Sequence, residues 1–126
     1  ELIKKYLSRY EVVDFGCLNK DSCDYPDFAH QLCQNLKGKE EDIGILICGT
    51  GIGMSIVANR YENVRAALCL NEKMAKLAIE HNNANVLCIP ARYTSIPQAL
   101  KMVETFLSTN FEGGRHQNRV NKIPIC

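Results

Sequence analysis

Apolar residues recur along this chain with two different periods, and the two periods alternate. Short β-branched runs predict buried strands, and apolar residues spaced three or four positions apart predict amphipathic helices. The predicted strands are residues 11–15, 43–48, 64–70 and 85–89. The predicted helices are residues 1–9, 26–36, 54–60, 72–81, 96–108 and 115–122, with a polar loop at 16–25.

The alternation of strands and helices predicts an α/β fold of the Rossmann-like kind. In that fold a parallel sheet is covered by helices on both faces, giving three layers. No internal repeat or linker divides the chain, so residues 1–126 form one domain. The chain opens on a helix, whereas doubly wound sheets usually begin with a strand. We therefore expect a further strand upstream of Glu1.

Composition narrows the class of protein without naming a function. Hydrophobic content of 46% and charged content of 23% are typical of a globular soluble domain. A net charge of +1 gives no indication of a nucleic-acid or membrane partner. The count of 7 cysteines is odd and includes no Cys-x-x-Cys pair. This favours reduced thiols in a cytoplasm over a disulfide framework or a zinc site.

The most informative segment is the predicted strand that ends at Cys48 and runs into alternating glycines. A strand, a glycine turn and a helix N-terminus present backbone N–H groups that favour an anion. Ligands of α/β sheets bind beyond the carboxyl ends of the strands, and this setting favours the thiolate of Cys48. A buried structural thiol and a tight turn are the alternative explanations. Cys33, Cys69 and Cys88 lack this setting and are expected to pack in the core.

Two familiar glycine motifs do not fit this segment. The phosphate-binding loop needs Lys followed by Ser or Thr after its last glycine, whereas Gly53 precedes Met54 and Ser55. The dinucleotide fingerprint needs G-x-G-x-x-G, and the spacing here is G-x-G-x-G. Because Glu72 lies about 20 residues further on, where that fingerprint places its ribose-binding acid, nucleotide binding stays open.

Two further groups of polar residues are candidates for chemistry. His81 ends a predicted helix, so it is either a simple helix-end residue or a general acid. Asn82 and Asn83 fit the left-handed cap of that helix. Arg115 and Arg119 are four apart and share a helix face, as a solvated basic terminus or as a clamp for phosphate.

Three segments carry a resemblance to a known family: residues 47–56, 80–86 and 111–120, with 24–26 and 64–67 in agreement. In this order they closely resemble ribose-5-phosphate isomerases of type B, almost from end to end. The resemblance implies interconversion of ribose 5-phosphate and ribulose 5-phosphate without metal or organic cofactor. It also implies a cytoplasmic enzyme of the pentose phosphate pathway, a dimer or tetramer whose active sites lie at a subunit interface.

The resemblance also implies roles for individual residues. Cys48 matches the base that moves a proton between C2 and C1, and His81 matches the acid that opens the sugar ring. Thr50 and the amides of residues 49–53 match the groups that stabilise the enediolate. The implied substrate-binding residues are Gly49, Gly51, Ile52, Gly53, Ser55, Asn82, Arg92, Arg115, Arg119 and Tyr25.

The chain departs from the family pattern at its beginning. The family opens with a strand and an Asp-His pair, and this chain starts inside the helix that follows; we expect both upstream. Three alternatives remain: an isomerase of galactose 6-phosphate or of a tetrose phosphate, a non-catalytic nucleotide-binding module, or an inactive truncated protein retained for assembly.

Overall fold

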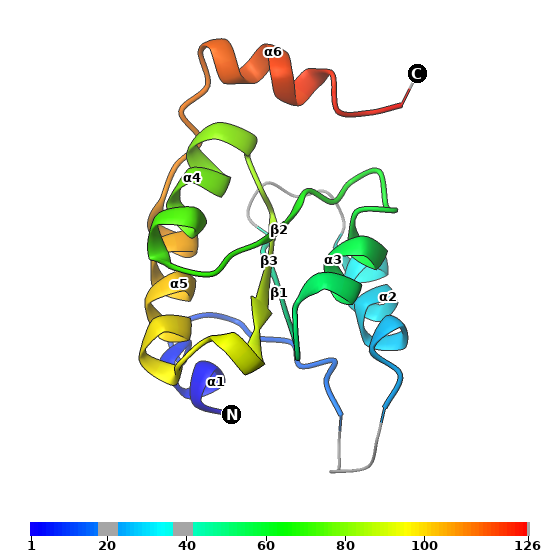
Figure 1. Ribbon diagram of the computed structural model, residues 1–126, viewed down its shortest axis with the longest axis vertical. Helices are drawn as coiled ribbons and strands as arrows, with labels where there is room; N and C mark the ends of the chain where they lie inside the picture. Colours follow the sequence, from blue (N-terminus) through cyan, green and yellow to red (C-terminus); the bar gives the residue numbers. More distant parts are fainter. Residues whose placement is uncertain (18–22, 37–41, 126) are drawn as a thin grey trace.

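The computed structural model describes residues 1–17, 23–36 and 42–125 (Figure 1). Cys126 and the middle of the loop expected at 16–25 lie outside the described residues. No helix of the described part has both the length and the apolar character that a membrane span requires.

A parallel sheet of three strands forms the middle layer. The strands are β1 (Gly44–Cys48), β2 (Ala66–Leu68) and β3 (Val86–Pro90), in the order β1-β3-β2. Gly44 and Ala66 both lie opposite Val86, so the strands start together and their carboxyl ends share one edge. β3 is central, and all five of its residues are buried, as expected of a strand covered on both faces.

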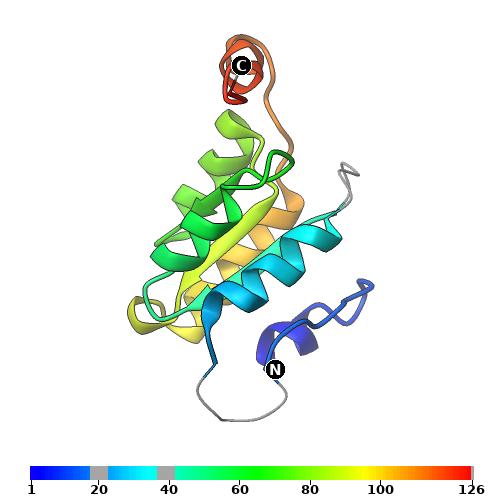
Figure 2. The ribbon, with the colours of Figure 1, turned by 90° about the vertical axis from the view of Figure 1, so that its right-hand side faces the viewer.

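Helices cover both faces of this sheet, which confirms the three-layer α/β prediction (Figures 1 and 2). Leu87 and Ile89 of β3 face one core, and Val86 and Cys88 face the other, because side chains alternate along a strand. One face carries α1 (Leu2–Tyr6), α4 (Glu72–Asn82) and α5 (Ile96–Ser108); the other carries α2 (Tyr25–Asn35) and α3 (Ile52–Ala58). The remaining elements are the 3-10 turn η1 (Ala91–Tyr93) and α6 (Arg115–Asn121).

The predicted strand at residues 11–15 is wrong. A strand is stabilised by pairing, and none of the described strands pairs with this segment. The side chain of Val13 is 66% exposed. The segment is instead tied to α1 by Lys4, whose ammonium lies 2.9 Å from the carboxylate of Asp14. The helix expected over 1–9 is also shorter, and the strand expected over 64–70 contracts to Ala66–Leu68.

The ends of the helices follow capping rules that the sequence carries. Ser95 and Gln98 form a capping box at the start of α5, and the side chain of Asn71 accepts a hydrogen bond from the Met74 N–H at the start of α4. Asn83 closes α4 in the left-handed conformation, with φ of 48°, as expected. Because α4 follows β2 and leads into β3, it starts beside the carboxyl ends of the strands and ends beside their amino ends.

Candidate functional site

The carboxyl edge of the sheet brings together the first group of predicted site residues. β1 ends at Cys48, and α3 starts four residues later at Ile52. The first N–H groups of a helix have no intrahelical acceptor, so they remain available to an anion. The hydroxyl of Thr50 accepts a hydrogen bond from the Ile52 N–H at 3.2 Å. The Ser55 hydroxyl donates to the Ile52 carbonyl at 2.7 Å, which ties it to its own helix.

Gly51 is the residue on which this turn depends. Its φ is 73°, and a Cβ added there would lie 2.5 Å from Cδ1 of Leu68. We expect Gly51→Ala to lower the free energy of unfolding by about 2 kcal/mol or more, since the left-handed backbone costs about 1–2 kcal/mol before the overlap is added. Urea denaturation measures this loss.

Gly113→Ala is the matched control, because Gly113 has φ of 70° and nothing within 4 Å of an added Cβ. Only the backbone cost of about 1–2 kcal/mol is expected there. Equal losses in the two variants would show that the packing against Leu68 contributes nothing.

Tyr25 and Arg92 close around the glycine turn from two other elements. The Arg92 N–H donates to the Gly49 carbonyl at 3.0 Å, and the Arg92 Nε lies 3.0 Å from where a Gly49 Cβ would be. The guanidinium therefore lies directly over Gly49. A Cβ on Gly53 would overlap the ring of Tyr25, so that ring packs against the first turn of α3. The structure thus brings residues 48–53, Tyr25 and Arg92 into one group, which we call the carboxyl-edge group.

Cys48 differs from the cysteines of the core. It is half-buried, whereas Cys33, Cys69 and Cys88 are at most 1% exposed, which confirms their predicted packing role. Burial raises the pKa of the Cys69 thiol to about 11 and that of Cys88 to about 12. These core thiols therefore stay protonated near neutral pH and are not nucleophiles. Cys48 is instead half-buried at the end of β1, four residues before the start of α3.

The amino edge of the sheet holds the second group. His81 and Asn82 are the last two residues of α4. The carbonyl of the next residue, Asn83, accepts a hydrogen bond from Nε of Arg65 at 2.7 Å, directly before β2. The chain then enters β3 at Val86. The end of α4 is thereby fixed beside the starts of two strands.

His81 has two neighbours that the sequence analysis did not assign. Its ring stacks on the ring of His116, with centroids 4.2 Å apart, and its Nε2 lies 3.8 Å from a carboxylate oxygen of Glu112. His116 is buried, and burial lowers the pKa of its imidazole, with the nearby His81 and Arg115 as further causes. The Glu112 N–H donates to the Glu80 carbonyl at 3.1 Å, which holds the chain against α4.

The same three side chains have the chemistry of a metal-ligand set. Ligand atoms of His81, Glu112 and His116 all lie within 4.8 Å of one another. A metal ion lies in the plane of each imidazole that binds it, and these two ring planes are only 12° from parallel. The lone pairs of the rings therefore do not converge on one point. The arrangement suits stacking of two imidazoles rather than shared coordination.

Arg115 and Arg119 lie on α6, which packs beside the end of α4 (Figure 1). Both side chains are exposed and one helical turn apart. Together with His81 and Asn82 they form what we call the amino-edge group. It offers two cations, an imidazole and an amide, which are groups that bind phosphate and hydroxyls.

One chain does not bring the two groups together. The carboxyl-edge group lies at the end of the sheet where Cys48 and Pro90 are opposite each other. The amino-edge group lies at the other end, beside Val86. The four steps of strand between Val86 and Pro90 separate them by about 13 Å. Figure 1 shows α6 and η1 at opposite ends of the sheet. Within a single chain, His81 therefore does not lie near Cys48.

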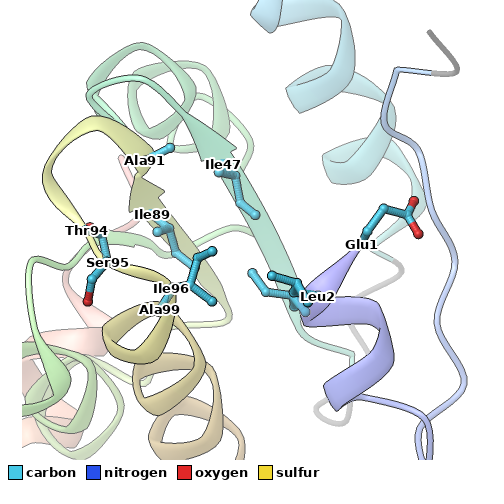
Figure 3. Close-up of a pocket in the computed structure, with 10 residues that line it drawn as sticks. Glu1, Leu2, Ile47, Ile89, Ala91, Thr94, Ser95, Ile96 and Ala99 are labelled. Carbon is cyan, nitrogen blue, oxygen red and sulfur yellow. The ribbon is translucent and has the colours of Figure 1, made fainter. Parts of the chain in front are cut away.

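A cavity of about 270 Å³ lies elsewhere, on the α5 face of the sheet. Figure 3 shows Leu2 of α1, Ile47 of β1 and Ile96 of α5 around it. Ile47 points to the opposite face from Cys48, because neighbouring side chains alternate. None of the predicted site residues lines this cavity.

Comparison with known proteins agrees with the fold. A family model described as Ribose/Galactose Isomerase matches residues 1–123. A protein of Mycoplasma genitalium named probable ribose-5-phosphate isomerase B is 46% identical over 127 residues, which cover 98% of this chain and 84% of that protein.

Two solved structures are similar throughout. The ribose 5-phosphate isomerase of Thermotoga maritima has a TM-score of 0.91 and 52% identity, covering 96% of this chain and 85% of that chain. The enzyme of Mycoplasma genitalium, solved with bound ribulose-5-phosphate, has a TM-score of 0.92 and 46% identity, covering 97% of this chain and 83% of that chain.

The chain therefore belongs to the ribose/galactose isomerase family, a class of sugar-phosphate isomerases with this three-layer fold. Within the family, these relatives are ribose-5-phosphate isomerases of type B. The resemblance found in the sequence is thus confirmed.

Proposed function

We propose that this protein interconverts ribose 5-phosphate and ribulose 5-phosphate through an enediolate, with Cys48 as the base and without a cofactor. The observation that carries the proposal is the position of Cys48, half-buried at the carboxyl edge of the sheet and beside the start of α3. A relative with 46% identity was solved with bound ribulose-5-phosphate, which supports the choice of substrate.

The carboxyl-edge group supplies the proton transfer. A proton next to a carbonyl becomes removable only when the oxyanion that forms is stabilised. The N–H groups at the start of α3 and the Thr50 hydroxyl serve this purpose, and one such donor contributes about 3 kcal/mol in comparable enzymes. A positioned base such as the Cys48 thiolate typically adds a factor of about 10²–10⁴.

The amino-edge group supplies ring opening and anchoring. His81 acts as the acid that opens the sugar ring, and Asn82 binds sugar hydroxyls. Arg115 and Arg119 hold the phosphate, together with Arg92 from the carboxyl-edge group. An anchored phosphate fixes C1 and C2 against the base, so binding energy lowers the barrier.

Because these groups lie at opposite edges of one sheet, each active site is completed by two copies of the chain. The carboxyl-edge group of one protomer faces the amino-edge group of its partner, in a homodimer. Exposed apolar side chains on α3 and α4 support such an interface: Ile52, Ile56, Met74 and Leu77. Buried free thiols are typical of proteins from a reducing compartment, which supports a cytoplasmic location.

The substrate is tested by steady-state kinetics on the full-length protein. We expect the highest kcat/KM for ribose 5-phosphate, with lower values for galactose 6-phosphate and tetrose phosphates. A preference for either of the others would reassign the substrate within the same chemistry. Saturable binding of NADH with no isomerase activity would support a nucleotide-binding module instead.

Arg115→Ala is expected to raise KM by about tenfold or more, because a charge-assisted contact to phosphate of about 1.5–3 kcal/mol is lost. The effect on kcat is expected to be smaller. Arg60→Ala is the control, since Arg60 is an exposed arginine at the end of α3 with no proposed contact. An unchanged KM in the Arg115 variant would reject the phosphate clamp.

A further inference from the structure

The exposed thiols of Cys17 and Cys23, which both precede α2 in the chain, lie close to each other. The Sγ atoms of Cys17 and Cys23 are 2.6 Å apart. A disulfide bond is about 2.05 Å long, so the sulfur atoms are already close to bonding distance. Five residues separate the two cysteines in the sequence.

This pair differs from the other cysteines that the structure describes. Cys33, Cys69 and Cys88 are buried in the two cores of the domain. Cys17 and Cys23 are exposed to solvent, where small oxidants reach them. Accessibility and a second thiol within reach are two of the features that favour reversible oxidation of a cysteine.

We propose that Cys17 and Cys23 form a redox modification site, a dithiol that a small disulfide such as glutathione disulfide oxidises to an intramolecular disulfide. One cysteine thiolate attacks glutathione disulfide and releases one glutathione thiolate, which leaves a mixed disulfide. The second cysteine thiolate then attacks the protein sulfur of that mixed disulfide and releases the other glutathione. In sum, two protein thiols are oxidised to one disulfide, and one glutathione disulfide is reduced to two glutathione thiols.

The modification site is coupled to the carboxyl-edge group through the chain. Cys23 lies two residues before Tyr25, the first residue of α2, whose ring packs against Gly53. A covalent bond from Cys23 to Cys17 restricts the backbone that leads into Tyr25. This coupling rests on the proposed function, whereas formation of the disulfide does not.

Thiol titration under denaturing conditions tests the disulfide. The protein treated with glutathione disulfide is expected to show two fewer thiols than the reduced protein. Cys17→Ser and Cys23→Ser are each expected to lack the two-thiol loss. Cys33→Ala is the matched control and is expected to keep that loss, because its thiol is buried.

Peptide mapping of the Cys33→Ala protein locates the bond. Trypsin cleaves after Lys20, between the two cysteines, so the disulfide is expected to hold the two resulting peptides together. Retention of all thiols, persistent glutathione adducts on Cys17 or Cys23, or a disulfide between other cysteines would overturn the proposal.

Kinetics test the coupling separately. Oxidised wild-type protein is expected to show a KM for ribose 5-phosphate at least twofold different from that of the reduced protein. The Cys23→Ser protein is expected to show the same KM after either treatment. An unchanged KM in oxidised wild type would overturn the coupling, and absence of any isomerase activity would contradict the proposed function while leaving the thiol counts to decide the disulfide.

Discussion

Cys48→Ala is expected to reduce isomerase turnover by about 10²–10⁴-fold, the contribution of a positioned base. Exchange of the C2 proton of ribose 5-phosphate with solvent deuterium is expected to fall by the same factor, because exchange requires the same base. Binding of the substrate phosphate is expected to persist, since Arg115 and Arg119 are unchanged. NMR of the C2 position and calorimetric titration with substrate measure the two effects.

Cys33→Ala is the control for the removal of a thiol. Cys33 lies on α2 and is 1% exposed. It belongs to the core against which Cys48 also packs, and it is not part of either group of site residues. Turnover close to wild type is expected there once the folded fraction has been accounted for. Near-normal proton exchange in Cys48→Ala would remove Cys48 from its role as base.

Mixing two inactive proteins, Cys48→Ala and His81→Ala, is expected to restore activity. If the active site combines the two edges from different protomers, each mixed dimer contains one intact site and one that lacks both residues. After random exchange of subunits, about a quarter of the wild-type activity is expected, since half of the dimers are mixed and half of their sites are intact. The rate of ribose 5-phosphate isomerisation after subunit exchange measures this recovery.

The matched control mixes His81→Ala with Arg115→Ala. Both residues belong to the amino-edge group, so every site in the mixed dimer carries one of the two defects, and the mixture is expected to show no more activity than the average of the two separate proteins. Recovery in this control, or none in the Cys48 and His81 mixture, would contradict a site shared between protomers.

The parts of the fold that the sequence predicted are those governed by local patterns. The helix predicted at 96–108 has the observed bounds, since its apolar residues recur with a regular helical period. The structure adds the capping box of Ser95 and Gln98 at its start. The strand that ends at Cys48 and the glycine turn after it follow from the same local rules. The left-handed cap at Asn83 was predicted for the same reason.

The parts that were missed depend on contacts between distant segments. The apolar run at 11–15 has the composition of a strand, but the described sheet does not pair with it. The stacking of His116 on His81 joins α6 to α4, and no spacing within either helix indicates it. By contrast, the position of His81 at the amino edge was indicated by the predicted order of strand, helix and strand, because a helix between two parallel strands ends beside their amino ends.

A consequence follows from the position of α6 at the end of the sheet away from η1. If the active site combines two protomers as proposed, a newly synthesised chain folds its core without a complete catalytic centre and becomes active only after it meets a second chain. At low expression, encounter of two chains is a second-order event, and the flux of sugar phosphate then grows with the square of protein abundance.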